Sequence, residues 1–360
     1  MTGGPKTLLV MCSGLGLGNS TRLLGVLQAL RLNFRVAPED LRVVVATNGR
    51  ATSFWEAEAP ALDVSVLALA GYAPSRQTAA RLRWRTFFRP SVVGAYLRNT
   101  ASLFAFLAHR RTALALIDSD YHSLPLFLFR IPVLSLGQAW DVLHRDEGNG
   151  PASRLPRASL LVERLDLMFQ RLVSERILVP CFDTDVAAPP NVTPVPLIVR
   201  REYSFAAPAP SKGRLLVLLG GSGIGSAPLL AYAKRHGLSV IGAPGESAAS
   251  LDSFGCPLID QAQAVLTQGG LSSLSECLAR GKRMIVLPIE GHAEQLSNAL
   301  AVERLGMALR VSDLDAPPEE FLRRLERLGR GEVDEFHRPR TDGAAVVAEI
   351  LLHELGLARA

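Results

Sequence analysis

Two segments of this 360-residue chain repeat one pattern, in which an apolar strand leads into a glycine-rich loop and then into an amphipathic helix. In both segments three glycines follow the strand with the same spacing: Gly14, Gly16 and Gly18 after residues 7–12, and Gly221, Gly223 and Gly225 after residues 215–219. A strand joined to a helix by a glycine turn is the usual first unit of a parallel βαβ sheet. A chain that carries this unit twice is expected to fold as two α/β halves.

The rest of the chain supports that division. Further apolar segments alternate with helical patterns, as in parallel α/β sheets, at 41–46, 113–117, 133–136, 176–179, 239–241 and 283–287. Residues 186–213 are rich in Pro and Ala, as expected of a connector rather than a core. We therefore predict two Rossmann-like α/β domains that face a central cleft, 1–205 and 206–360, with the last helix packing back on the first domain.

Composition excludes several classes of protein. The chain is 48% hydrophobic, but its apolar runs, such as 124–129, are far shorter than the roughly 20 residues of a membrane-spanning helix. The apolar start at 7–12 runs directly into the glycine loop, which favours a first strand over a signal peptide. The spacing of the four cysteines suits neither a zinc site nor a disulfide framework, and predicts a cytoplasmic protein: Cys12, Cys181, Cys256 and Cys277.

The first glycine loop does not fit an NAD-dependent oxidoreductase. Such an enzyme would have a third glycine where this chain has Asn19, and an acidic residue about 20 residues further on at the end of the second strand. The second strand ends here in Thr47 and Asn48. A dinucleotide cofactor is therefore disfavoured.

Small polar residues gather in the stretch 266–299, around the turns of one strand–helix–strand unit. Gln268 to Ser273 join a strand to a helix predicted at 274–279, and residues 291–295 open the helix after the next strand. In an open parallel sheet this edge binds ligands. Part of the pattern has another explanation, because Ser273 and Glu276 have the spacing of a capping box at a helix start.

Together these residues resemble the nucleotide-sugar half of GT-B glycosyltransferases, the family of MurG and of the UDP-glycosyltransferases. The resemblance covers the C-terminal half well and the N-terminal loop moderately. It implies that Glu276 binds the ribose of the donor and that Glu294 and Gln295 bind its sugar. The other donor- or substrate-binding residues that it implies are Gly16, Gly18, Gly221, Ser222, Gly223, Gln268, Gly270, Ser272, Ser273 and His292.

The resemblance also implies an inverting reaction without a metal or another cofactor. Displacement of a nucleoside diphosphate, here predicted to be UDP, leaves negative charge that backbone N–H groups and a helix N-terminus can stabilise. Three Asp-x-Asp sequences occur, at 118–120, 183–185 and 313–315, and the last two run into proline-rich segments typical of loops. The second domain is thus expected to bind the nucleotide sugar and the first to bind the acceptor.

The chain departs from the family at its N-terminal loop. Relatives commonly have Gly-His-x-x-Arg, whereas this chain has Asn19 in place of the histidine, and asparagine cannot take a proton. Asp118, Asp120 and His122 follow an apolar strand whose carboxyl end should face the cleft. We predict Asp120 as the general base, with Asn19 and His122 beside it. Alternatively, the segment 118–122 only forms a loop and caps the next helix.

Eight arginines and no acidic residue lie between positions 74 and 111, interleaved with aromatic residues. Basic residues beside exposed aromatics suit an anionic membrane surface, and MurG-like enzymes use lipid-linked acceptors. We predict peripheral attachment at the inner face of the membrane through Arg81, Arg83, Arg85 and Arg89. An amphipathic helix with its aromatics in the core is an alternative, and nucleic acid is disfavoured because no reader motif accompanies the arginines.

The predicted function is transfer of a sugar from a nucleotide diphosphate, UDP above all, to a hydroxyl of a lipid-linked or apolar acceptor. Two other functions fit the same sequence. A nucleotide-sugar 2-epimerase of this fold would need no acceptor, and Asn19 suggests a protein that binds sugar nucleotides without turnover.

Overall fold

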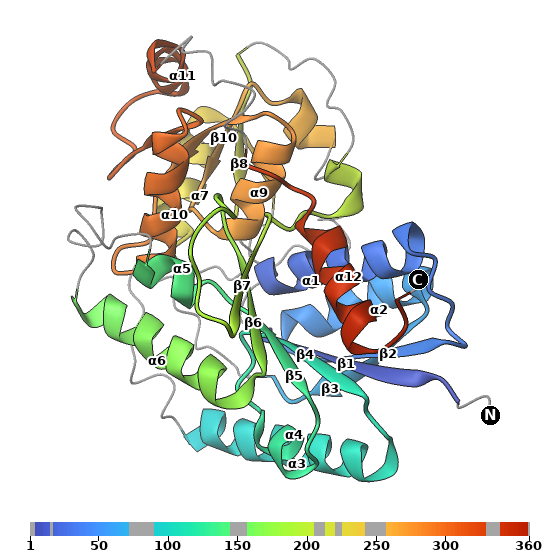
Figure 1. Cartoon of the computed structure of the whole chain (residues 1–360). Coiled ribbons are helices and arrows are strands. Elements are labelled where there is room, and N and C mark those ends of the chain that lie inside the picture. The colour runs from blue at the N-terminus through green and yellow to red at the C-terminus, as the bar shows by residue number, and fades with distance from the viewer. Residues whose placement is uncertain are drawn as a thin grey trace.

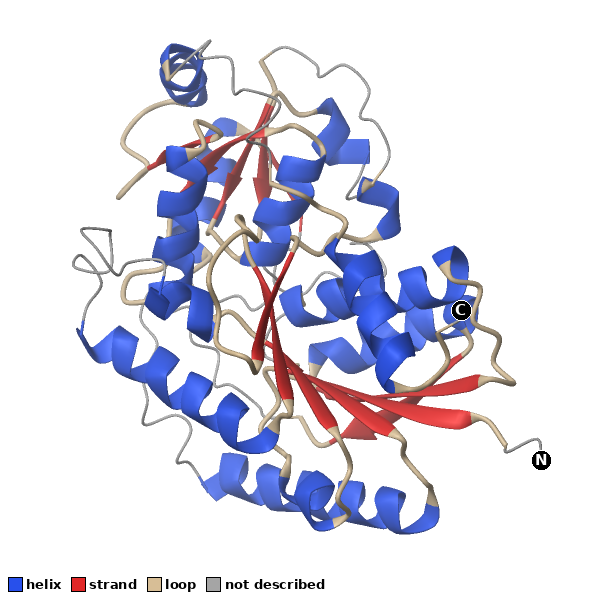
Figure 2. Ribbon diagram, viewed as in Figure 1, coloured by secondary structure: helices blue, strands red, loops and turns tan. Residues whose placement is uncertain are grey.

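The computed structural model describes residues 4–14, 17–71, 90–144, 157–204, 213–219, 225–241, 257–328 and 339–358. Within these residues the chain forms two parallel β-sheets, each covered by helices (Figures 1 and 2). The first sheet has the strand order β3-β2-β1-β4-β5-β6-β7 and the second has the order β12-β11-β10-β8-β9. The predicted fold class, α/β with two parallel sheets, is confirmed.

The first sheet contains the strands β1 Lys6–Cys12, β2 Leu41–Asn48, β3 Val64–Leu69, β4 Leu114–Asp118, β5 Val133–Leu136, β6 Arg176–Pro180 and β7 Val192–Val195. One face is covered by α1 Gly18–Gln28 and α2 Arg50–Leu62, and the other by α3 Pro90–His109, α4 Leu124–Leu128, α5 Ala139–His144 and α6 Arg157–Val173. Strand β1 is buried between the two layers because six of its seven residues are apolar or small. Its register pairs Cys12 with Asp118, so β1 and β4 end side by side.

The second sheet contains β8 Leu215–Leu218, β9 Ser239–Ile241, β10 Ala264–Thr267, β11 Arg283–Val286 and β12 Ala308–Arg310. Two helices, α9 Leu271–Ala279 and α10 Ala293–Arg304, share a core with one face of this sheet. The opposite face packs against α7 Ala227–His236 and α11 Pro318–Arg327. The glycine–serine turn thus lies where β10 ends and α9 begins.

The last helix, α12 Gly343–Glu354, lies beside α1 in the first half of the molecule (Figure 1). Val347 and Leu351 are fully buried in the same core as β1. Leu197, in the segment after β7, is hydrogen-bonded to residues around the start of α12. Its N–H donates to Arg340 O at 3.0 Å, and its carbonyl oxygen accepts from Gly343 N at 3.1 Å. The chain therefore crosses between the two sheets twice, and the two crossing segments are hydrogen-bonded to each other.

Two details differ from the sequence predictions. Within the predicted connector, residues 192–195 form strand β7 and bury Val192 and Val195, so the connector assignment is wrong there. Pro194 has no N–H to donate. It is tolerated in β7 because this strand lies at the edge of the sheet, where one side of its backbone pairs with no further strand. Helix α9 begins at Leu271, directly after its N-cap Gly270, rather than at the predicted residue 274.

Candidate active site

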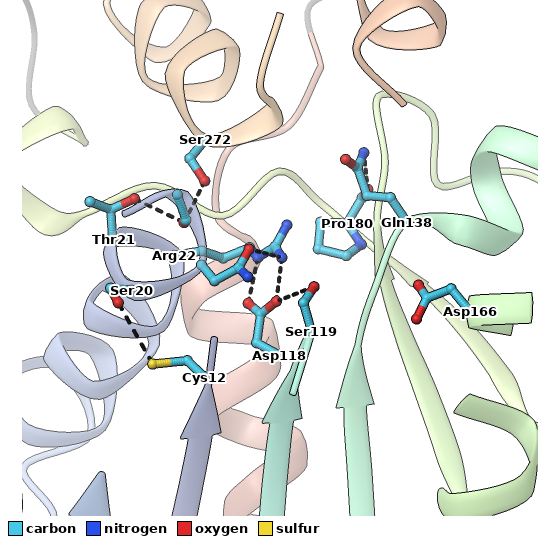
Figure 3. A network of polar contacts seen from close by, with 12 residues as sticks. Cys12, Ser20, Thr21, Arg22, Asp118, Ser119, Gln138, Asp166, Pro180 and Ser272 are labelled. Atoms are coloured by element: carbon cyan, nitrogen blue, oxygen red, sulfur yellow. Dashed lines mark hydrogen bonds and ion pairs between the residues drawn. The ribbon is translucent and has the colours of Figure 1, made fainter. Parts of the chain in front are cut away.

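The N-terminal glycine loop and the glycine–serine turn of residues 268–273 meet where the carboxyl edges of the two sheets face each other. Ser272, in the first turn of α9, donates its hydroxyl to Gly18 O at 2.7 Å, and Gly18 opens α1 (Figure 3). Both residues were predicted to bind substrate. The described structure thus brings the start of one predicted donor-binding helix against the start of the N-terminal helix.

Directly below this contact lies a buried ion pair between α1 and β4. Arg22 binds Asp118 with both arms of its guanidinium, Nε to Oδ2 at 2.9 Å and Nη2 to Oδ1 at 2.6 Å (Figure 3). Nη2 also lies 3.4 Å from Asn19 Oδ1. Burial raises the pKa of Asp118, although Arg22 opposes this shift. Arg22 was not predicted as a site residue, but it is the arginine of the family's Gly-His-x-x-Arg pattern.

Asp120 and His122 form a second buried pair in the loop after β4. Asp120 Oδ1 accepts hydrogen bonds from the backbone N and from Nδ1 of His122, at 2.9 and 2.8 Å. The imidazole stacks on Tyr96, with 4.7 Å between ring centroids, and its Nε2 lies 3.4 Å from Asn99 Nδ2. Helix α3, which carries Tyr96 and Asn99, therefore covers this pair. The role of Asp120 as general base remains a prediction.

The glycine–serine turn has a backbone that excludes side chains. Gly269 has φ of +93°, and a Cβ there would lie 2.9 Å from Gln295 O. Its carbonyl accepts from Asn298 Nδ2 at 3.3 Å, and the side chain of Gln295 accepts from Ile289 N at 3.0 Å. Gln268 is buried beside this turn, whereas a Cβ at Gly270 would meet no atom within 4 Å. Gly270 therefore leaves open space in front of α9.

Glu276 is held by an arginine from the connector. Arg200 donates from Nε to Oε1 of Glu276 at 2.8 Å and from Nη2 to Oε2 at 3.3 Å, and both side chains are buried. Arg200 also donates to Tyr203 OH at 3.1 Å. Helix α9 begins at Leu271 with Gly270 as its N-cap, so Ser273 lies inside the helix and the capping-box explanation for Ser273 and Glu276 is wrong. The acidic partners of Arg200 raise its pKa well above the ordinary value, against the effect of burial.

Other polar contacts join the first half of the chain to α10 and the residues before it. Gln138, just after β5, exchanges hydrogen bonds of 3.4 Å with Asn298 of α10, and Ser159 of α6 donates to Gly291 O at 2.6 Å. His292 is the extended N-terminal capping residue of α10, and Glu294 lies half-buried in its first turn. Four predicted donor residues lie outside the described residues: Gly16, Gly221, Ser222 and Gly223.

The four arginines of the predicted membrane contact, Arg81, Arg83, Arg85 and Arg89, also lie outside the described residues. Among the residues that are described, no cluster of three His, Cys, Asp or Glu side chains could hold a metal ion. Helices long and apolar enough to cross a bilayer are likewise absent from the described part of the chain.

Comparison with known proteins adds the family context. Residues 256–349 match the family model of the glycosyltransferase family 28 C-terminal domain. An uncharacterized glycosyltransferase of Methanosarcina acetivorans is 33% identical over 107 residues, which is 28% of each chain. The UDP-N-acetylglucosamine-N-acetylmuramyl-(pentapeptide) pyrophosphoryl-undecaprenol N-acetylglucosamine transferase of Thermotoga neapolitana is 29% identical over 98 residues, 26% of this chain and 28% of that one. The chain thus spans less than a third of the length of these relatives.

Similarity to solved structures extends over nearly the whole chain. The glycotransferase of kitacinnamycin superposes with a TM-score of 0.57 at 18% identity, covering 97% of this chain and 99% of that one. MurG of Acinetobacter baumannii gives a TM-score of 0.54 at 14% identity, covering 97% and 100%. The chain has the GT-B fold.

The predicted resemblance to GT-B glycosyltransferases is therefore confirmed. Within this GT-B fold, the described residues that were predicted for the donor follow β10 and β11, and those predicted for the acceptor side follow β1 and β4. Arg22 and Arg200 complete the two clusters. Both arginines are far in sequence from the carboxylates that they bind, so only the fold brings each pair together.

Proposed function

We propose that this protein is an inverting glycosyltransferase that moves a sugar from a nucleotide diphosphate, UDP above all, to a hydroxyl of an apolar or lipid-linked acceptor. The observation that carries this proposal is the contact between Ser272 and Gly18, because it sets the predicted donor turn directly against the predicted acceptor edge. A sugar held at one edge would be within reach of a hydroxyl held at the other. The match to a glycosyltransferase family domain over 256–349 supports the same conclusion.

On the donor side, the N-terminus of α9 supplies the electrostatic stabilisation. The first N–H groups of a helix have no intrahelical partner, and the helix dipole adds positive potential there. Open space at Gly270 lets a diphosphate approach these groups. As the acceptor oxygen bonds to the anomeric carbon, the bond to the diphosphate oxygen breaks, and its charge develops beside these fixed donors.

Glu276 is proposed to bind the ribose while it remains paired with Arg200. Each carboxylate oxygen can accept more than one hydrogen bond, so the two bonds from Arg200 leave capacity for the ribose hydroxyls. The two bonds from Arg200 also fix the orientation of the carboxylate. Glu294 and Gln295 are proposed to bind the sugar from the start of α10.

On the acceptor side, we propose that Asp120 and His122 act as a pair. Asp120 accepts a hydrogen bond from Nδ1 and orients the ring, and Nε2 is proposed to take the proton of the acceptor hydroxyl. Asn99 Nδ2 lies 3.4 Å from Nε2, so the acceptor hydroxyl would take the place of this amide at the ring. Asn19 takes no proton in this scheme and bonds with Arg22 instead.

The apolar acceptor is proposed to arrive from an anionic membrane surface. Helix α6 exposes four apolar side chains with a spacing that sets them on one side of the helix: Leu161, Leu165, Met168 and Leu172. Phe127 of α4 is 76% exposed and Leu97 of α3 is 62% exposed. Exposed arginines lie on the same helices, at Arg98, Arg164 and Arg171. Apolar side chains flanked by cations suit a membrane interface.

Vesicle sedimentation tests this surface. Changing Phe127 and Leu172 to Glu should strongly reduce sedimentation with anionic vesicles, and higher salt should weaken the association of the unchanged protein. Leu328→Glu is the matched control, because Leu328 is 47% exposed but lies in the second half, at the end of α11. Equal sedimentation of all three proteins would exclude the proposed membrane surface and favour a soluble acceptor.

Incubation with UDP-sugars tests the reaction itself. Release of UDP only when an acceptor is present supports transfer, and release that persists in EDTA supports a metal-independent reaction. Exchange at C2 of the sugar without an acceptor would identify an epimerase. Binding of the nucleotide without any product would identify a protein that binds sugar nucleotides without turnover.

A further inference from the structure

Three carboxylates lie beside the proposed acceptor edge, and Arg22, which interacts electrostatically with one of them, Glu294, is already paired with Asp118. Glu163 and Asp166 are three residues apart on α6, and Glu294 lies in the first turn of α10. Burial raises the pKa of Glu163 to about 8, with repulsion from Glu294 and Asp166 adding to the shift. Burial also raises the pKa of Asp166 to about 6, and Glu294 and Asp118 add to it. Among the described residues, no ion pair joins any of the three to an arginine or lysine.

The carboxylate of Asp166 points toward the ends of the central strands. In Figure 3 it faces Asp118 and Ser119 across the carboxyl edge of the first sheet. Tyr121 OH donates to its Oδ1 at 2.9 Å, and Gln170 Nε2 donates to its Oδ2 at 2.8 Å. The acidic group therefore belongs to the edge where the acceptor is proposed to bind.

Gln170 supplies an independent sign of a missing donor. Its side chain is only 4% exposed, and its Oε1 meets no hydrogen-bond partner within the described residues. The amide lies over Gly137, directly after β5, where a Cβ would be 2.2 Å from Nε2. A buried carbonyl oxygen without a donor is unfavourable by about 1–3 kcal/mol, so a ligand that brings a donor would relieve it.

An aromatic surface borders the same group. Tyr121 is 46% exposed and packs edge-on against Phe169, with 5.0 Å between ring centroids. Aromatic faces attract cations, and an ammonium group donates three hydrogen bonds, whereas a hydroxyl donates one and brings no charge. Three carboxylates, an unpartnered carbonyl and an exposed ring together match an ammonium group.

We propose that Glu163, Asp166 and Glu294, with Gln170 beside them, form a subsite for a protonated amine of the acceptor substrate. The inference rests on the proposed function, because the ligand is the acceptor of that reaction. It adds a substrate class: an acceptor that carries an amine near the hydroxyl to be glycosylated. Glu294, at the start of α10, would lie between this amine and the donor sugar.

Calorimetry with two matched ligands tests the subsite on the full chain saturated with UDP. Aminohexanol carries an ammonium group and a hydroxyl, whereas hexanediol carries two hydroxyls on the same chain. Aminohexanol should bind at least about tenfold more tightly, and Asp166→Asn should remove most of this preference. Asp166→Glu, which keeps the charge, should retain part of it. Glu56→Gln, on the exposed side of α2, is the control and should leave the preference unchanged.

The pH dependence gives a second readout. An alkylammonium stays charged between pH 6 and 8, while Asp166 and Glu163 ionise as the pH rises past about 6 and about 8. Aminohexanol should therefore bind more tightly at pH 8 than at pH 6, and hexanediol should not respond.

Three outcomes would overturn the subsite: equal affinity for the two ligands, an unchanged preference in Asp166→Asn, or binding of MgCl2 that Asp166→Asn abolishes while aminohexanol does not bind. Binding of UDP is measured first and separately. If UDP binds and the amine is not preferred, only the subsite fails. If UDP does not bind at all, the proposed function fails as well.

Discussion

The two sheet edges that meet at the candidate site are built from different chemistry. At the edge of the first sheet, ionisable side chains face one another: Arg22 binds Asp118, Asp120 binds His122, and further carboxylates lie on α6. At the edge of the second sheet, glycines and serines expose the backbone at the start of α9, and a buried charge pair, Arg200 with Glu276, lies behind that turn. A backbone site suits a ligand part that never varies, such as a diphosphate. A side-chain site can be adapted to one acceptor.

Removal of a buried charge from the first edge should have the largest effect of these changes, and it should act on the free energy of unfolding. Asp118→Ala leaves the guanidinium of Arg22 buried without its partner, and we expect a loss of about 3–5 kcal/mol in the free energy of unfolding, measured in urea. Arg323→Ala removes an exposed pair with Glu320 on α11 and should lower it by only about 0.5 kcal/mol or less. Similar losses in the two variants would mean that the first edge does not depend on its buried charges.

Glu276 tests whether the charge pair of the second edge serves the donor. Glu276→Gln should weaken UDP binding by roughly 10- to 100-fold, because the ribose loses a charged acceptor. Asp260→Asn is the matched control, since Asp260 pairs with Arg280 in an equally buried bridge of the same half. Both variants should lose stability, but only Glu276→Gln should lose UDP affinity in titrations of the folded protein. Unchanged affinity would assign Glu276 a purely structural role.

Loss of the contact between the two edges should reduce UDP affinity less than the Glu276→Gln change does. Ser272→Ala removes the hydroxyl that donates to Gly18 O and that is proposed to face the diphosphate, so we expect UDP affinity to fall about fivefold, equivalent to about 1 kcal/mol. Ser275→Ala removes a buried hydroxyl bonded inside the same helix, to Leu271 O at 2.8 Å. It serves as the control, and a fall of the same size in Ser275→Ala would show that the effect comes from α9 rather than from the contact.

The pH dependence of stability should be the mildest signal of the acidic first edge. Folding raises the pKa of Glu163 from about 4.5 to about 8, so the folded state binds this proton more tightly than the unfolded state does. Stability from Glu163 is then present at low pH and is lost as the pH rises toward about 8. We expect Tm to fall between pH 5 and pH 8 and the fall to be smaller in Glu163→Gln. An identical pH profile in that variant would remove Glu163 as the cause.

The same contrast explains what could be predicted from the sequence. The residues of the turn from Gln268 to Ser273 are contiguous in the sequence. Its glycines and its position after a strand are therefore enough to predict a ligand-binding turn without any tertiary information. Arg22 and Asp118 are 96 residues apart, and Arg200 and Glu276 are 76 apart, so nothing local indicates that they meet. The orientation of Asp120 toward His122 and α3 likewise depends on packing. The spacing of Ser273 and Glu276 was misleading, because α9 already begins at Leu271 and Ser273 is therefore not at the N-cap.

The chain crosses between its two halves twice, and this affects the order in which the halves can fold during translation. The core of the first half includes Val347, Leu351 and Leu355, which are synthesised after the described strands of both sheets. Domains usually fold in the order of their synthesis. Here the first half cannot complete its core until α12 has been synthesised, so the second half has the opportunity to fold first. During translation, the apolar surface of α1 and of the adjoining face of β1 would stay exposed until α12 is synthesised. We expect a chaperone to bind at this exposed surface.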